Sequence, residues 1–179
     1  MRFRFAVVCA ASLCLLMFTP VATAALANSR CSLPTGLGEE LARKYPAAKV
    51  VDLGDLSRDD RGFFQKDHGD RCPGLARVDF YGDGKPTWAL VLIASDGRKR
   101  EARLVVARQV GANWETSSLD TANGSAPVVW RQDPGEYRDV YGEKTIRATH
   151  PVIVFAGYES WAILYAWTGK RVQKIWLAD

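Results

Sequence analysis

Apolar residues recur at every second position over much of the chain after residue 75, and this period predicts β-strands. The clearest case is segment 161–167, where large aromatic and aliphatic residues alternate with smaller apolar ones. A Thr-Gly-Lys turn follows it, and residues 172–177 complete a predicted hairpin. Because alternate side chains of a strand point to opposite faces, residues 161, 163, 165 and 167 are expected to share one face and residues 162, 164 and 166 the other.

Segment 87–93 is apolar at almost every position, which indicates a central strand covered on both faces. Asp83-Gly84 before it and Asp96-Gly97 after it are hairpin signals. Further strands are predicted at 75–80, 102–110, 114–118, 128–132, 145–148 and 152–156.

The segment before residue 75 has a different pattern. Residues 32–44 contain a predicted helix that Pro46 ends, and 49–53 form a short predicted strand. A second helix is predicted from 58 to about 66, with Ser57 as its N-cap.

These elements predict an α+β fold in which β-structure dominates. Two short N-terminal helices would precede an antiparallel β meander, sandwich or propeller-like sheet. No linker divides the chain, so residues 28–179 are interpreted as one β-rich domain.

Residues 1–27 have the three parts of a cleavable signal peptide. Arg2 and Arg4 form a positive start, an apolar run covers 5–18, and small residues follow Pro20. The run is shorter than a membrane span needs. We therefore expect a periplasmic or secreted protein with no membrane span after cleavage.

Cleavage would remove Cys9 and Cys14 and leave Cys31 and Cys72 as the remaining cysteines. In an oxidising compartment two cysteines usually pair, so a disulfide between them is predicted. The alternative is a free reactive thiol.

Loss of Arg2 and Arg4 would lower the formal net charge from +4 to +2, and no long basic run remains. Nucleic-acid binding would require a strongly basic face. The composition therefore argues against a nucleic-acid partner.

Segment 79–87 contains Asp79, Asp83 and Gly84 between two predicted strands. It resembles the calcium loop of FG-GAP and integrin-propeller repeats, with Asp79 and Asp83 at the first and third ligand positions. Tyr81 and Thr87 stand at the other two positions, and calcium takes about six to eight oxygen ligands. The expectation is a hairpin turn with weak or absent calcium and no other cofactor, with a bound calcium ion as the alternative.

Segment 134–142 is bounded by Pro-Gly and Gly, which indicates a projecting loop. Tyr137, Arg138 and Tyr141 within it are residue types enriched at interface hot spots. They are the candidate partner-binding residues, and an ordinary hairpin connection is the alternative interpretation of the segment.

Catalytic candidates are fewer. Glu136, Asp139 and Glu159 could supply the two carboxylates that a glycoside hydrolase needs about 5 to 9 Å apart. His68 lies between acidic residues and could act as a general base, but the segment is interpreted as a polar loop. No nucleophile elbow and no second histidine at metal-ligand spacing accompany it.

A small β-rich exported chain with one disulfide and a calcium-like loop is similar in architecture to the periplasmic inhibitors of lysozymes and other cell-wall hydrolases. Immunity proteins that pair with wall-cleaving toxins belong to the same group. The resemblance implies a non-catalytic binding protein whose protein partner is a cell-wall hydrolase, with the loop at 137–141 entering the enzyme cleft. One alternative is a secreted cell-wall hydrolase that uses carboxylates near Glu159, and another is a structural envelope protein.

Overall fold

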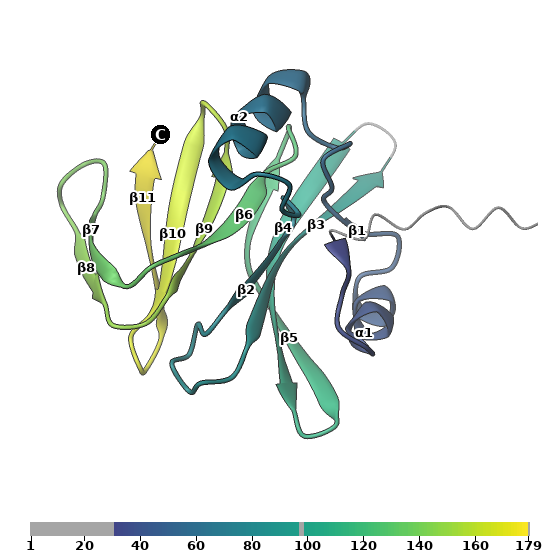
Figure 1. The fold of residues 1–179 in the computed structure, drawn as a ribbon, viewed down its shortest axis with the longest axis horizontal. Helices are drawn as coiled ribbons and strands as arrows, with labels where there is room; N and C mark the ends of the chain where they lie inside the picture. The colour runs from purple at the N-terminus through teal and green to yellow at the C-terminus, as the bar shows by residue number, and fades with distance from the viewer. Residues whose placement is uncertain (1–30, 97–98, 179) are drawn as a thin grey trace, which may run out of the picture.

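A computed structural model describes residues 31–96 and 99–178, which form antiparallel β-sheets and two helices (Figure 1). The predicted signal peptide, residues 1–27, lies outside the described residues. In chain order the elements are α1 (Leu37–Lys44), β1 (Lys49–Val50), α2 (Arg58–His68), β2 (Leu75–Val78), β3 (Thr87–Asp96), β4 (Lys99–Val110), β5 (Asn113–Asn123), β6 (Val128–Gln132), β7 (Gly135–Arg138), β8 (Thr145–Ala148), β9 (Val152–Gly157), β10 (Trp161–Trp167) and β11 (Val172–Ala178).

Two sheets contain most of the strands. In the first, called sheet A, β3, β4 and β5 are neighbours, and both β1 and β2 pair with β3. In the second, called sheet B, the order is β11-β10-β9-β6, and β7 and β8 form a separate hairpin. All pairings are antiparallel.

The predicted β-dominant fold with antiparallel sheets is therefore confirmed, whereas the propeller alternative has no support. The two helices do not form a block ahead of the sheets, because β1 lies between them and pairs with β3.

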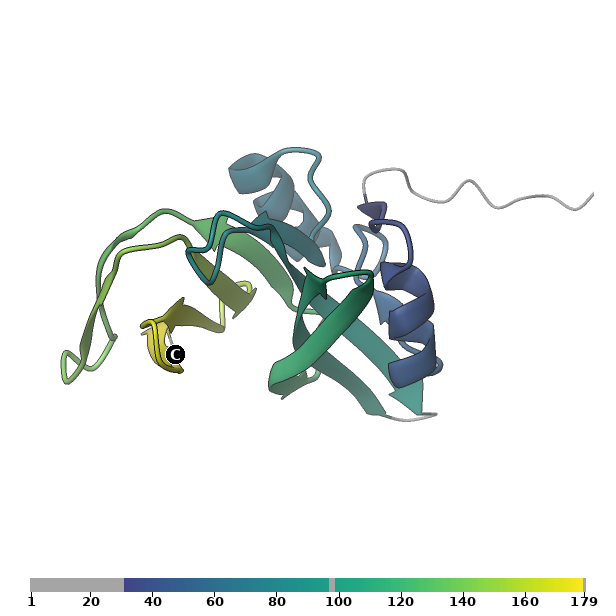
Figure 2. The ribbon, with the colours of Figure 1, turned by 90° about the horizontal axis from the view of Figure 1, so that it is seen from below.

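The central hydrophobic cluster lies between the two sheets and contains side chains from β3, β9 and β10. As predicted, β3 is covered on both faces, since Val91 belongs to the central cluster while Leu90 packs with α1. On the outer side of sheet B, β7 and β8 cover a smaller cluster. Figure 2 shows α1 outside sheet A and the β7–β8 hairpin outside sheet B.

Local signals set the ends of α2. Ser57 Oγ accepts a hydrogen bond from the Asp60 N–H at 3.0 Å, which confirms the predicted N-cap. The helix continues to His68, two residues beyond the prediction, and ends at Gly69, whose φ is 64°. Its buried Phe64 joins the central cluster.

Strand β5 is longer than predicted. Residues 121–123, which lie beyond the predicted strand at 114–118, continue the pairing with β4 beyond an irregularity at Leu104/Val105. Exposed polar side chains suit an edge strand because one face and one edge remain in water.

A polar cluster links the two sheets at β5. Asp120 on β5 accepts hydrogen bonds from the Tyr165 hydroxyl on β10 and from Lys174 Nζ on β11, the latter at 2.9 Å. Burial alone would raise the pKa of Asp120, but these two donors outweigh it and hold the pKa below its usual value. Burial and the bond to Asp120 raise the pKa of Tyr165, which stays a neutral donor.

The predicted disulfide is present. Cys31 and Cys72 are bonded, with their Cα atoms 5.0 Å apart. The bond joins the segment before α1 to the segment before β2. Neither helix in the described ranges has the length and apolar character required to cross a bilayer.

Candidate functional site

The segment predicted to project as a contact loop forms a hairpin, which was the alternative interpretation. Its first part forms β7, which pairs with β8 from Gly135↔Ala148 to Arg138↔Thr145. The Pro and Gly that suggested a loop lie at the start of the strand, where neither interrupts the four-residue ladder. The turn itself covers residues 139–144.

Tyr137 is placed differently from the expectation for a contact residue. Its ring packs against the cluster under the hairpin, and its hydroxyl donates to the Asp133 carbonyl. Burial, followed by the nearby Asp133 carboxylate, raises the pKa of Tyr137. Tyr137 therefore anchors the hairpin to sheet B more than it faces a partner.

Arg138 and Tyr141 lie on the solvent side. Arg138 is exposed and its Nη2 donates to the Gly142 carbonyl at 3.3 Å. Tyr141 is 59% exposed, and the adjacent Val140, which the sequence did not single out, is 48% exposed. Large apolar side chains with this exposure are few among the described residues, and these two are neighbours.

Backbone hydrogen bonds fix the tip, which we define as residues 139–142. The Asp139 N–H donates to the Lys144 carbonyl, and the Gly142 N–H donates back to the Asp139 carbonyl. The Asp139 carboxylate is buried and accepts from the Glu143 N–H at 2.9 Å. The Val140 N–H donates to the Trp176 carbonyl of β11 at 2.8 Å, which attaches the tip to sheet B.

The three candidate catalytic carboxylates do not form one site. Glu136 pairs with Arg147 on the hairpin at 3.2 Å, and the Asp139 carboxylate is engaged in the tip. Glu159 lies in the β9–β10 turn with a φ of 55°. None of the three lines any of five pockets found among the described residues, and each of those five contains at most one carboxylate.

Asp79 and Asp83 lie in the connection between β2 and β3. Asp79 Oδ2 accepts from the Gly84 N–H at 3.1 Å, and Asp83 Oδ1 accepts from the Lys85 N–H at 3.0 Å. These are bonds of a tight turn, with Gly84 at a φ of 76°. In the part of the chain that the structure describes, no three His, Cys, Asp or Glu side chains are grouped to hold a metal ion.

The two histidines are packed against other groups. His68 is the last residue of α2, not part of a loop, and its ring lies 4.9 Å from Phe64 and 5.0 Å from Trp130. Burial is the main cause that lowers its pKa. His150 lies against Gly82, where a Cβ would approach the imidazole to 2.3 Å. Only glycine fits there without displacing the ring.

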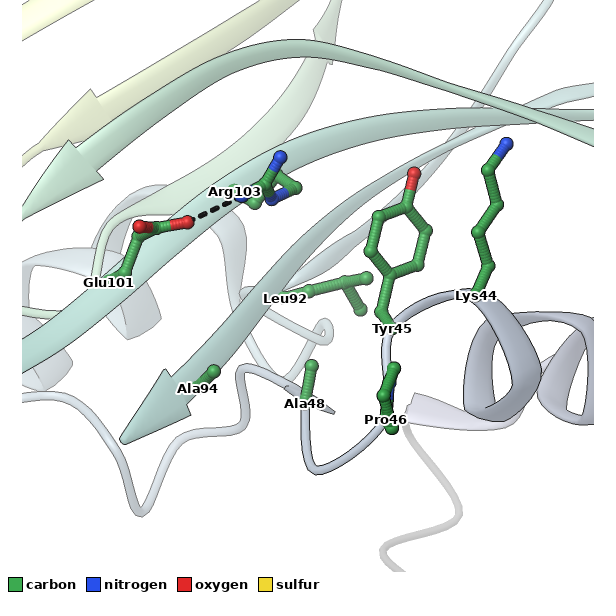
Figure 3. Close-up of a pocket in the computed structure, with 8 residues that line it drawn as sticks. All are labelled: Lys44, Tyr45, Pro46, Ala48, Leu92, Ala94, Glu101 and Arg103. Atoms are coloured by element: carbon green, nitrogen blue, oxygen red, sulfur yellow. Dashed lines mark hydrogen bonds and ion pairs between the residues drawn. The ribbon is translucent and has the colours of Figure 1, made fainter. Parts of the chain in front are cut away.

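One pocket lies beside the C-terminus of α1, with a volume of about 330 Å³ (Figure 3). Its charged groups are already engaged, since Arg103 bonds Glu101 at 2.6 Å and Lys44 Nζ donates to the Thr116 carbonyl. Figure 3 shows Tyr45 and Leu92 as its apolar wall. Glu101 and Arg103 compensate one another, so Lys44 supplies the one charge in this lining that no carboxylate of the pocket balances.

A second pocket, of about 450 Å³, lies between α2, β2 and β6 and was not predicted. Its arginines come from three separate segments, so no local sequence pattern could have indicated that they meet.

Comparisons with models of protein families, with curated proteins and with solved structures found no significant match for this chain.

Proposed function

We propose that this chain is an exported, non-catalytic binding protein that inhibits a cell-wall hydrolase, as periplasmic lysozyme inhibitors and immunity proteins do. The observation that carries the proposal is the tip of the β7–β8 hairpin, with Val140 and Tyr141 adjacent and exposed. The disulfide between Cys31 and Cys72 supports a location in an oxidising compartment, where disulfides persist.

The tip combines exposure with order. Its backbone is fixed by bonds within the turn and by the Val140–Trp176 bond to β11. Binding by an ordered segment costs less conformational entropy than binding by a flexible one. Tyr141 supplies a large contact surface and Arg138 a planar donor group beside it.

The tip also suits insertion into a cleft. In Figure 1 the hairpin turn lies at one extreme of the molecule, beyond β11. A projecting turn can enter a concave site that a flat sheet cannot. An enzyme cleft that binds polymer chains is a concave site of this kind.

The decisive experiment measures peptidoglycan hydrolysis by lysozymes and by wall-cleaving toxins of the host, with and without the disulfide-bonded protein. We expect inhibition, and we expect Val140→Ala/Tyr141→Ala to weaken it by roughly thirtyfold, since truncating hot-spot residues costs about 2 kcal/mol or more. The melting temperature should not change, because both side chains are exposed.

Val110→Ala is the matched control, because Val110 is a comparably exposed apolar residue at 44% but lies away from the hairpin. It should leave inhibition unchanged. Tyr137→Ala should lower the melting temperature as well as the inhibition, since Tyr137 anchors the hairpin. Failure to inhibit any hydrolase, or turnover of a wall substrate by the protein alone, would overturn the proposal.

A further inference from the structure

A groove runs along the junction of the two sheets. We call it the β2–β6 groove and define it by Arg71, Arg77, Trp88, Trp130 and Arg131. Two neighbouring pockets, of about 300 and 460 Å³, share Arg77 with it and extend it past Lys85. The groove is separate from the hairpin tip and does not depend on the proposed inhibitor function.

The groove is positively charged. Four cationic side chains line it and its extensions: Arg71, Arg77, Lys85 and Arg131. The one carboxylate in the same lining is Asp79, and Arg131 also pairs with Asp133 at 2.8 Å. Within the described residues, Arg71, Arg77 and Lys85 have no carboxylate partner. An anionic group in the groove would meet several cations whose charges are not already compensated.

The groove also contains the facing edges of β2 and β6, which lie close together without forming a hydrogen-bonded ladder. β2 pairs only with β3, and β6 pairs only with β9, among the described strands. The Val129 N–H points away from β9 and donates to the Pro73 carbonyl at 2.8 Å. Because backbone groups alternate sides along a strand, those of Arg131 also point away from β9.

The same reasoning applies to β2. The Gly74 carbonyl accepts from the Val91 N–H of β3, so alternation directs the backbone groups of Arg77 to the other side. The hydrogen bonding between the two edges thus begins at Val129 and Pro73 and is not continued toward Arg77 and Arg131. Each of these arginines therefore presents to the groove both a guanidinium and backbone groups that belong to no ladder on that side.

The aromatic rings of the groove are less available than its charges. The Arg77 guanidinium lies over the Trp88 ring, 6.0 Å from its centroid, and His68 lies against Trp130. Sugar rings would need an open aromatic face for stacking. The geometry therefore favours a ligand that uses charge and backbone hydrogen bonds.

We infer that the β2–β6 groove binds an acidic polypeptide segment in extended conformation, belonging to another protein. Its backbone would pair with the open edge beside Arg131, as in β-strand addition. Its Asp or Glu side chains would bind Arg77, Arg71 and Lys85.

The test uses the disulfide-bonded protein and a short, end-blocked, fluorescent peptide that alternates Glu with Val. Fluorescence anisotropy should show saturable binding that weakens with added salt. Arg77→Gln/Arg131→Gln should weaken it by about tenfold or more, because both groups contact the peptide directly. Arg58→Gln/Arg147→Gln removes the same charge outside the groove and should have little effect.

Three further ligands separate the contributions of side-chain charge, backbone hydrogen bonds and ligand class to binding in the groove. A Gln-for-Glu peptide should bind weakly because it lacks charge. A peptide with Pro in place of Val should bind weakly because half of its backbone N–H donors are missing. A galacturonate oligomer carries carboxylates on sugar rings and should bind more weakly than the acidic peptide.

Absence of peptide binding would overturn the inference. So would equal loss in the two double variants, unimpaired binding of the Pro peptide, or tighter binding of the sugar oligomer. Thermal denaturation of each variant shows whether a loss reflects unfolding. The Val140→Ala/Tyr141→Ala variant should keep peptide binding. The peptide inference can therefore fail while the inhibitor proposal holds, and the inhibitor proposal can fail while the peptide inference holds.

Discussion

At the level of single residues, the contribution of a charged side chain to stability depends on how deeply its hydrogen bonds are buried. Asp120 is the clearest case, because the bonds from Tyr165 and Lys174 cross from sheet B to sheet A. The Tyr165 hydroxyl is attached to a side chain that is only 2% exposed, so its loss of a partner would leave a buried donor unsatisfied. By contrast, Arg108 and Glu115 on neighbouring strands are exposed and pair at 2.9 Å in solvent.

We expect Asp120→Ala to lower the free energy of unfolding by about 1–3 kcal/mol at neutral pH, the range for losing hydrogen bonds to a charged group. Glu115→Ala, which breaks the exposed pair on the same strand, should cost less than about 1 kcal/mol. Denaturant unfolding monitored by tryptophan fluorescence measures both values. Equal effects of the two substitutions would contradict the bridging role of Asp120.

The same carboxylate gives a pH dependence with a defined sign. The folded-state pKa of Asp120 lies below the ordinary value of 3.8, so the unfolded chain takes up the proton first as the pH falls. Its stabilisation is therefore complete above that value and is lost as the pH decreases through the folded-state pKa. The difference in stability between the native protein and Asp120→Ala should shrink on acidification.

At the scale of elements, turns and short hairpins explain most of the differences from the sequence-based expectations. Strands β6, β8 and β10 have the predicted bounds because their apolar alternation meets a buried face. β7 was missed because its four residues contain a single large apolar side chain, Tyr137. Its strand conformation comes from pairing with β8 and from the packing of that ring, which local sequence does not encode.

The β2–β3 turn provides a prediction about calcium. We expect calcium binding to be absent or weaker than millimolar, because Asp79 and Asp83 accept backbone bonds and Tyr81 and Thr87 occupy the other ligand positions. Asp79→Ala should lower the melting temperature equally in EDTA and in millimolar calcium. Isothermal titration calorimetry that shows micromolar binding, abolished in Asp83→Ala, would contradict this interpretation.

At the scale of the whole molecule, the faces of the strands were predictable and the way the sheets meet was not. The alternation in β10 assigned Ile163 and Leu164 to opposite faces, and the two residues do belong to different clusters. The meeting of Arg77 with Arg131 could not be foreseen, because it depends on how β2 and β6 approach one another across sheets. The exposed tip was found only in part, since Arg138 and Tyr141 were named but Val140 was not.

The disulfide gives the prediction that concerns the whole chain. The bond closes a loop with a sequence separation of 41 residues, which stabilises the folded state by about 4 kcal/mol in the chain-entropy account. Mature protein without residues 1–27, made in an oxidising compartment, should contain no free thiol when denatured, and reduction should lower its melting temperature by several degrees. Cys31→Ala/Cys72→Ala is the control, since its melting temperature should not respond to the reductant.

Two groups of three consecutive strands, which we call the meanders, pair with neighbours close in sequence, and this affects the order in which the chain can fold. β3–β4–β5 and β9–β10–β11 are each joined by connections of two to four residues, and closing such short loops costs little entropy. Contacts between strands close in sequence form quickly, whereas contacts between distant segments form slowly. Each meander can therefore assemble first, and the association of the two sheets, with the Asp120–Tyr165 bond between them, becomes the late step. Until that step the apolar faces of β3 and β10 are open to water, so a folding chain is most exposed to aggregation between the formation of the two meanders and their docking.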